Sequence, residues 1–240
     1  MSKFSAPYLV SAIIALSATA ADACTPMPAT YAPDKPGSVA WARHTRTEAY
    51  IQTRLVERAF ATIGIGDSIM GMWPSELLEA KWGGPVLNAG RGGSTTLHWL
   101  EWLDTWDWAL QSPAVIHIHI GRNDITLGSC PAAIAQSVLA VIAKVKAKWP
   151  TARVVWQSIP PGGEWLRLKA FEVREVNRLV IEQAATQGFQ VLDAWPVIHA
   201  WCKGVRSCGA FYAGDAYGGG PIHLGPNAYE AIYREGRLLP

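Results

Sequence analysis

The sequence predicts an α/β protein of three layers, in which helices cover both faces of a five-stranded parallel sheet. Short apolar runs alternate along the chain with longer segments of helical periodicity, and few polar residues interrupt the apolar runs. A repeated order of strand and helix is typical of a parallel sheet, and near-continuous apolar strands are typical of burial on both faces. Half of the 240 residues are hydrophobic, so the chain can form one sizeable core.

Each element follows from its local pattern. The runs that predict strands are AFATIGIG (59–66), GPVLNAG (84–90), AVIHIHIG (114–121), ARVVWQSI (152–159) and FQVLDAW (189–195). The segments that predict helices span 40–57, 70–81, 95–110, 131–148, 165–187 and 226–237. Trp99, Trp102 and Trp106 recur at helical spacing in the third of these segments, which predicts a stripe that faces the core.

The first 23 residues have the features of a cleaved signal peptide. Lys3 supplies a basic start, residues 8–17 are mostly apolar, and the small-residue triplets ATA and ADA fit a cleavage site. The apolar run is short for a transmembrane helix, and Asp22, two residues before Cys24, fits a lipid-anchor signal poorly. We therefore predict a periplasmic or secreted protein without stable membrane insertion, with one domain over residues 24–240.

Export would place the four cysteines in an oxidising compartment, where they are candidates for disulfides. Cys202 and Cys208 flank the short loop CKGVRSC and are placed to pair with each other. By elimination, Cys24 and Cys130 are left as the second pair. No CxxC spacing or His/Cys cluster indicates a zinc site, and no metal or organic cofactor is expected.

The charge pattern argues against nucleic acid as the main partner. The formal net charge is +2, and no cluster of Lys and Arg is present that would follow a phosphate backbone. No nucleic-acid partner is therefore expected.

Polar segments follow four of the predicted strands where each strand ends. They are GDS (66–68), NAGRGGS (88–94), GRND (121–124) and SIPPGG (158–163). In an open α/β sheet, ligands bind at the carboxyl ends of the strands, next to the point where the strand order reverses. Because these segments meet at that one edge, the sequence predicts a site there.

The residue types in these segments suit nucleophilic catalysis by a serine. Ser68 stands at a turn from strand to helix, where its own backbone N–H is close to free helix donors. Gly90 has no Cβ, so its N–H can approach a ligand closely, and Asn123 offers a side-chain amide. His223 lies just ahead of the last predicted helix and is the candidate base.

The blocks GDSI, NAG, GRND and a late IHL resemble the SGNH (GDSL-type) hydrolase superfamily in their order and approximate spacing, over residues 58–235. The segments LNAGRGGSTT and IHIGRNDI are most similar to the platelet-activating-factor acetylhydrolase-like and carbohydrate acetylesterase branches. The resemblance implies a flavodoxin-like fold with Ser68 as nucleophile and His223 as base. It also implies an oxyanion hole made of the N–H groups of Ser68 and Gly90 and the side chain of Asn123.

One position departs from the family pattern. The family places an aspartate three residues before the histidine, to orient its ring, and Gly220 stands at that position here. Asp215, eight residues before His223, is the nearest carboxylate upstream, and the GGG run is able to fold it back. A backbone carbonyl is the alternative partner of the imidazole, and weak or absent activity is a third outcome, since loss of the orienting carboxylate costs about four orders of magnitude in serine proteases.

Tryptophan, arginine, aspartate and histidine residues near the predicted site are candidates for substrate binding or for structural roles. Trp73 and Trp165 each follow a loop of the site and are candidates for stacking on a sugar. Arg122 is a candidate contact for an acidic or phosphorylated substrate, with surface solvation as the alternative. Asp67 is interpreted as a cap of backbone N–H groups. His117 and His119 point to one face of a central strand and are interpreted as buried, hydrogen-bonded core histidines, with a metal pair that lacks an evident third ligand as the alternative.

The resemblance implies an exported serine esterase that removes a short acyl group, acetyl above all, from a carbohydrate or related alcohol through an acyl-serine. The partner predicted from these motifs is a small-molecule ester or an acylated polysaccharide. Two other functions stay open. An exopolysaccharide O-acyltransferase would use the same serine with a sugar hydroxyl in place of water. A carbohydrate-binding or scaffold protein would keep the fold with little or no activity.

Overall fold

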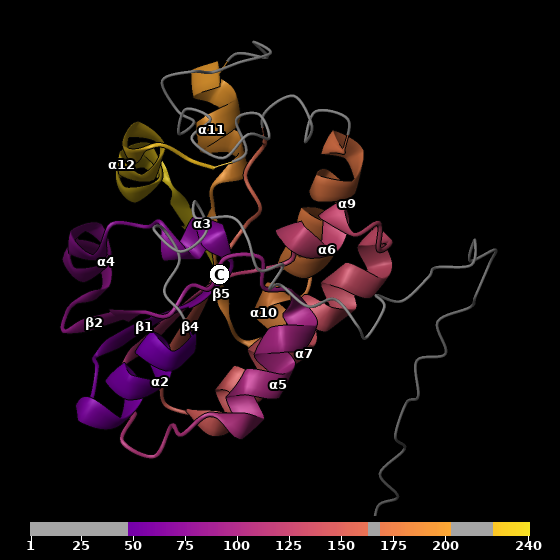
Figure 1. Ribbon diagram of the computed structural model, residues 1–240. Coiled ribbons are helices and arrows are strands. Elements are labelled where there is room, and N and C mark those ends of the chain that lie inside the picture. The colour runs from indigo at the N-terminus through magenta and orange to yellow at the C-terminus, as the bar shows by residue number, and fades with distance from the viewer. Residues whose placement is uncertain (1–47, 163–168, 203–222) are drawn as a thin grey trace, which may run out of the picture.

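The computed structural model of the protein describes residues 48–162, 169–202 and 223–240 (Figure 1). The predicted signal peptide lies outside these residues, and the predicted boundary of the domain at residue 24 stays a prediction.

The centre of the fold is one sheet of six strands in the order β2-β1-β3-β4-β5-β6. The strands are β1 (Thr62–Gly66), β2 (Val86–Asn88), β3 (Val115–His119), β4 (Arg153–Gln157), β5 (Gln190–Asp193) and β6 (Arg237–Leu239). The first five strands pair in parallel, in register with Ile63 opposite both Leu87 and Ile116. The predicted α/β class and parallel sheet are confirmed, and the order of the first five strands is flavodoxin-like.

The sixth strand corrects the predicted count of five. β6 pairs antiparallel with β5, so that Leu239 lies opposite Val191 and Arg237 opposite Asp193. Three residues are too few to show an alternating pattern, and the helical pattern that precedes β6 extends over its first residue. An antiparallel strand at the edge of a parallel sheet is common in such folds.

Helices cover the two faces of the sheet in separate layers (Figure 1). One layer holds α2 (Glu48–Glu57), α5 (Thr96–Thr105), α7 (Pro131–Lys148), α9 (Ala170–Ile181) and α10 (Ala184–Gln187). The other holds α3 (Ser68–Gly71), α4 (Ser75–Trp82), α11 (Trp195–Cys202) and α12 (Pro226–Glu235). The short helix α6 (Arg122–Thr126) follows β3 at the carboxyl edge of the sheet.

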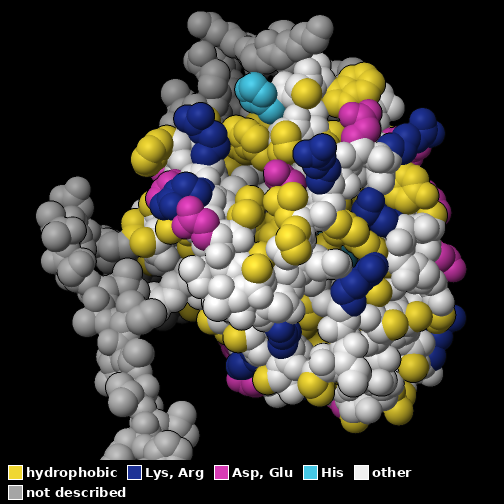
Figure 2. Space-filling view, turned by 180° about the vertical axis from the view of Figure 1, so that it is seen from behind, with side chains coloured by type: hydrophobic (Ala, Val, Ile, Leu, Met, Phe, Trp, Pro, Cys, Tyr) yellow, Lys and Arg dark blue, Asp and Glu magenta, His cyan; other side chains and the backbone are white. Residues whose placement is uncertain are grey.

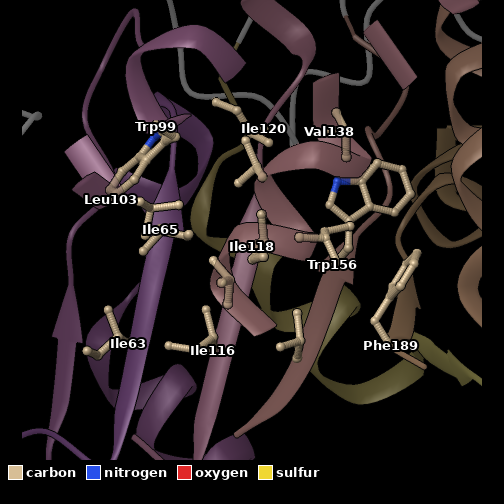
Figure 3. Packing of buried hydrophobic residues seen from close by; sticks show 14 of the residues in the cluster. Ile63, Ile65, Trp99, Leu103, Ile116, Ile118, Ile120, Val138, Trp156 and Phe189 are labelled. Atoms are coloured by element: carbon tan, nitrogen blue, oxygen red, sulfur yellow. The ribbon is translucent and has the colours of Figure 1, made fainter. Parts of the chain in front are cut away.

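Alternation along the strands gives the two faces different chemistry. Ile63, Ile65, Ile116 and Ile118 point to the larger cluster, where they meet Trp99 and other side chains of the helical layer (Figure 3). The other face of β3 carries His117 and His119, both fully buried, as the sequence interpretation expected. The face beneath α3 is therefore the polar one.

The helices differ from the predicted segments in several places. Helix α5 ends at Thr105 rather than at residue 110, α12 ends at Glu235 rather than at residue 237, and the short helix α6 was not predicted. The predicted helix 70–81 is two helices, because Pro74 is the N-cap of α4 and separates it from α3. The predicted helix 165–187 is resolved into α9 and α10 within its described part. Helix α11 was not predicted, since its apolar sequence WPVIHAWC shows no helical alternation. The bounds of α7 are those predicted, with Pro131 at its first turn.

The surface of the described residues agrees with the low net charge. On the face shown in Figure 2, Lys and Arg side chains are spread among hydrophobic and uncharged side chains rather than gathered in one patch. None of the helices in the described part of the chain has the length and apolar character needed to span a membrane.

Neither described cysteine, Cys130 or Cys202, has a free thiol. The predicted pairing also involves Cys24 and Cys208, which lie outside the described residues, so this pairing stays a prediction.

Candidate active site

Ser68 lies where β1 turns into α3. Gly66 ends the strand with φ +151°, and a Cβ there would lie 1.9 Å from the carbonyl oxygen of His119. Glycine is therefore needed for β1 and β3 to come this close. Asp67 is the N-cap of α3, and its Oδ1 accepts a hydrogen bond of 2.8 Å from the N–H of Ile69, as the sequence interpretation expected. This cap places Ser68 at the first position of the helix.

The imidazole of His223 contacts this serine. Its Nε2 lies 2.9 Å from Ser68 Oγ, although the two residues are 155 positions apart in the sequence. Both residues are half-buried. The hydroxyl of Tyr229, on α12, donates a hydrogen bond of 2.8 Å to the carbonyl oxygen of Ile69. This bond joins α12 to α3 and so keeps the histidine segment beside the serine turn.

Asn123 reaches the same edge from β3 through α6. Its Nδ2 donates a hydrogen bond of 2.8 Å to the carbonyl oxygen of Ser94, in the loop that follows β2. Asp124 joins the same two segments, because its carboxylate accepts from the backbone N–H of Thr96 at 3.3 Å and also from its hydroxyl. The loops after β2 and β3 are therefore held together beside the serine turn.

Gly90 has a packing role that the sequence reasoning did not include. A Cβ at Gly90 would lie 2.1 Å from the backbone nitrogen of Gly71, so only glycine lets the end of β2 pack against α3. The N–H of Gly90 donates to Asn88 Oδ1 at 3.0 Å. Asn88 Nδ2 in turn donates to the carbonyl oxygens of Met70 and Trp73, at 2.7 and 2.9 Å. Asn88 therefore supports α3 from a buried position. It belongs to the NAG block, in which only Gly90 was predicted to have a role.

The carbonyl oxygen of Gly66 is a second anchor beneath the serine. It accepts hydrogen bonds from the N–H of Arg91 at 2.8 Å, the hydroxyl of Ser94 at 3.0 Å and the indole N–H of Trp99 at 3.1 Å. Trp99 is fully buried, which confirms that this tryptophan stripe faces the core. The polar end of one core tryptophan therefore supports the turn that carries Ser68.

Two predicted substrate contacts are buried. Trp73 is 2% exposed; its ring packs edge-on against His117 and in a tilted arrangement against Tyr229, with ring centroids 4.8 and 5.2 Å away. Trp73 offers no ring face to a sugar, so its predicted contact with a sugar is wrong. The position of a residue after a loop in the sequence does not indicate whether its side chain is buried. Arg122 is 4% exposed, which rules out the solvated surface position considered for it. Asp215 and Trp165 lie outside the described residues.

Burial controls the charges beneath the site. Loss of solvation raises the pKa of Asp67 to about 7, although the positive charge of Arg122 and the bond from Ile69 act in the opposite direction. Burial also lowers the pKa of His119 to about 3, helped by the positive charge of Arg122. Burial likewise lowers the pKa of His117 to about 3, and the neighbouring His119 and Lys81 act in the same direction because they disfavour a second positive charge.

The chemistry that this arrangement allows is proton transfer between an imidazole and a hydroxyl, next to several backbone and amide donors. Within residues 48–162, 169–202 and 223–240, no group of three His, Cys, Asp or Glu side chains is arranged to hold a metal ion.

Several solved structures share this fold at low sequence identity. A member of the lipolytic G-D-S-L family from Veillonella parvula is 17% identical, with a TM-score of 0.56, and the match covers 72% of this chain and 93% of that one. A Streptococcus pneumonia protein named for platelet activating factor is 21% identical, with a TM-score of 0.59 and coverage of 76% and 87%. Axe2, an acetylxylan esterase from Geobacillus stearothermophilus, is 17% identical, with a TM-score of 0.55 and coverage of 74% and 91%.

The flavodoxin-like sheet, with a serine and an imidazole in contact at its carboxyl edge, defines a three-layer α/β hydrolase of the esterase type. No significant sequence match is found among curated proteins. The chain belongs to the GDSL-like lipase/acylhydrolase family, whose model matches residues 62–231. The predicted membership of the SGNH superfamily is thereby confirmed.

Proposed function

We propose that this protein is an exported serine esterase that removes short acyl groups, acetyl above all, from a carbohydrate or related alcohol. The observation that carries the proposal is the distance of 2.9 Å between Ser68 Oγ and His223 Nε2. A hydroxyl becomes a nucleophile when a neighbouring base takes its proton. A neutral imidazole at this distance is within reach of that proton.

The proposed cycle has two halves. In the first, His223 takes the proton of Ser68, and Oγ attacks the ester carbonyl carbon; the bond to the alcohol then breaks, and His223 gives the proton to the leaving oxygen. In the second, His223 takes a proton from water, which attacks the acyl-serine and releases the acid, and Ser68 regains its proton.

The oxyanion of each half needs donors that are already in place. The N–H of Ser68 and the side-chain amide of Asn123 are two of the proposed donors. The N–H of Gly90 would have to share its hydrogen with Asn88 Oδ1. Gly93, with φ +72°, directly precedes the residue that Asn123 contacts, and its N–H meets no acceptor within the described residues. Gly93 is therefore the alternative third donor, and the donors to the phosphonyl oxygen in a crystal structure of a phosphonate adduct would decide between the two glycines.

The partner of the second ring nitrogen of His223 is proposed from sequence alone, because residues 203–222 lie outside the described part. Asp215 and a backbone carbonyl are the two candidates. Turnover by Asp215→Ala separates them, since a loss of several orders of magnitude supports the carboxylate and unchanged turnover supports the carbonyl.

The substrate class is proposed from the similarity of fold to an acetylxylan esterase, which favours an acetylated glycan. With Trp73 buried, Trp165 is the remaining tryptophan proposed to contact a sugar. Export is proposed from the basic and apolar N-terminal segment.

A fluorophosphonate probe tests the chemistry directly. We expect it to label the wild-type protein on Ser68 and to leave Ser68→Ala unlabelled. Absence of labelling of the wild type would support the scaffold alternative instead. Rates for 4-nitrophenyl acetate, butyrate and octanoate then test the acyl group: preference for octanoate would move the proposed substrate from an acetylated sugar to a lipid.

The acyltransferase alternative uses the same residues and differs in the acceptor. Incubation of the enzyme with a donor ester and an oligosaccharide distinguishes the two, because a hydrolase accumulates the free acid and a transferase accumulates acylated oligosaccharide.

A further inference from the structure

A buried carboxyl and a buried imidazole lie together beneath Ser68. Asp67 and His119 are both fully buried, and Asp67 Oδ1 lies 3.8 Å from His119 Nε2. The backbone N–H of Asp67 also donates to the carbonyl oxygen of His119, at 3.1 Å. Asp67 directly precedes Ser68, and His119 lies four residues before Asn123. The pair therefore joins the segment that carries the serine to the segment that carries the amide.

The hydrogen bonds of this pair are incomplete. Asp67 Oδ1 accepts from Ile69, but in the described part of the chain Oδ2 and both ring nitrogens of His119 make no hydrogen bond of ordinary geometry. The backbone N–H of Met70 lies near the carboxyl and the backbone of Gln157 lies near the imidazole, each too far away or too poorly aligned for a regular bond. An ionised carboxylate with one oxygen buried and without a regular hydrogen bond is costly. A protonated carboxyl avoids this cost. Its O–H can donate to the neutral imidazole after the side chains move from the present separation of 3.8 Å to hydrogen-bond distance.

The charged and titratable groups around Asp67 do not remove this cost. Arg122 on α6 favours ionisation, whereas Asp124 on the same helix opposes it, and the phenol of Tyr229 on α12 is itself kept neutral by burial. Burial outweighs Arg122, so the pKa of Asp67 rises to about 7 while that of His119 falls to about 3. Between about pH 3 and pH 7 the pair therefore holds one proton, on the carboxyl.

We propose that Asp67 is a positioning residue that supports the site in its uncharged form, with His119 as the acceptor of its carboxyl hydrogen. The proposal rests on the proposed function. Attack by Ser68 creates a negative charge on the substrate oxygen beside the N–H of Ser68. A carboxylate one residue away would oppose that charge across a poorly solvated region. An uncharged carboxyl keeps the cap on Ile69 without this repulsion.

The test is the pH dependence of Ser68 modification by a fluorophosphonate in the full-length protein. In the wild type, we expect the rate to rise as His223 loses its proton and then to fall above about pH 7, approaching tenfold per pH unit if the ionised form is inert. Asp67→Asn keeps an oxygen that can cap Ile69 and cannot ionise. We expect this variant to keep the rise and lose the fall.

The matched control is Asp124→Asn, which removes the other buried carboxyl near the site. It should retain the alkaline fall of the wild type. A fall that persists unchanged in Asp67→Asn, or a wild-type rate that does not fall at all, would overturn the proposal.

A second measurement keeps the proposal testable if Asp67→Asn does not fold or if the wild type is not labelled. The infrared difference spectrum of the wild type between pH 6 and pH 8 should contain the carbonyl band of a protonated carboxyl that is lost on ionisation, and the band should persist in Asp124→Asn. Its absence from both proteins would exclude a protonated Asp67, whereas failure of labelling with the band present would count against the proposed function alone.

Discussion

At the scale of single residues, the contact between Ser68 and His223 makes the strongest prediction. Ser68→Ala should abolish turnover of 4-nitrophenyl acetate, because no other atom replaces the nucleophile. His223→Ala should lower kcat by about three orders of magnitude or more, since catalysis without a triad member retains only the contribution of binding and the oxyanion hole. The control is His199→Ala: His199 is exposed on α11, and its loss should leave kcat unchanged. Equal activity of His223→Ala and wild type would refute the role of the imidazole.

Asn123 gives a separate prediction about the oxyanion. Asn123→Ala should lower kcat by about 10²–10³, the usual effect of losing one donor, with a smaller change in KM. Asn177→Ala is a useful comparison, because the amide of Asn177 only braces Ile159, at 2.8 and 2.9 Å. It should lower the thermal midpoint more than it lowers kcat. If Asn123→Ala lowered stability and left kcat intact, its amide would be structural.

The residue scale also shows what sequence reasoning can and cannot supply. Ser68, Asn123 and His223 stand in ordered blocks, and the structure brings Ser68 and His223 into contact and joins Asn123 to the loop after β2. Their catalytic roles are predictions from the sequence that the variants above test. Trp73 follows the same kind of block but is buried by α12 and β3, and nothing local in its sequence indicates that packing. Asn88 was missed because its importance lies in two buried hydrogen bonds to the carbonyl oxygens of Met70 and Trp73, which are 18 and 15 residues away in the sequence.

At the scale of elements, the close approach of β2 and α3 positions the serine turn. Gly90→Ala should place a Cβ 2.1 Å from the nitrogen of Gly71, a backbone atom that cannot move without shifting α3. We expect a loss of about 1–3 kcal/mol in the free energy of unfolding, as for other overpacked sites, together with slower fluorophosphonate labelling. Urea unfolding measures the first effect.

Gly83→Ala is the control for this prediction. Gly83 has φ +92°, and nothing lies within 4 Å of its would-be Cβ, so this change strains the backbone without displacing α3. It should leave the labelling rate of the folded protein unchanged. Normal labelling of Gly90→Ala would show that the position of Ser68 does not depend on this contact.

Most of the elements that the sequence predicted are long enough for their pattern to be read. The exception is β2, which has only three residues but lies within the longer run GPVLNAG, bounded by glycines. The five parallel strands are apolar runs bounded by turn residues, and α7 has eighteen residues with Pro131 at its start. The elements that were missed are short or uniformly apolar. β6 has three residues, and α11 buries one side of a sequence that is apolar all round, so its periodicity is hidden. The break at Pro74 divides the predicted helix 70–81 into α3 and α4.

At the scale of the whole molecule, folding moves protons from two imidazoles to two carboxyls. In the unfolded chain near pH 5, histidines are protonated and aspartates are ionised. In the folded protein, burial keeps His117 and His119 neutral, with pKa values of about 3, and keeps Asp67 and Asp124 protonated, with pKa values of about 7 and 6. Between about pH 4.5 and 5.5, these four groups therefore bind two protons in each state.

The signs of the four contributions oppose each other. The two histidines have folded pKa values below their unfolded values, so their burial costs more stability as pH falls. The two aspartates have folded pKa values above their unfolded values, so their burial costs more stability as pH rises. In the wild type the opposite pH dependences of the histidines and the aspartates cancel between about pH 4.5 and 5.5. Removal of one histidine or one aspartate should leave part of the opposite pH dependence of stability uncompensated.

Two single variants test this balance with opposite signs. In Asp67→Asn the unfolded state binds one proton more than the folded state, so stability should rise relative to wild type by about 1.4 kcal/mol per pH unit. In His117→Gln the folded state binds one proton more, so the relative stability should fall by a similar amount per pH unit. Urea unfolding of the three proteins at pH 4.5, 5.0 and 5.5 measures both differences, and all other groups cancel in the comparison. Parallel pH profiles for all three proteins would show that the buried layer beneath α3 does not exchange protons on folding, and would also remove the electrostatic basis for an uncharged Asp67.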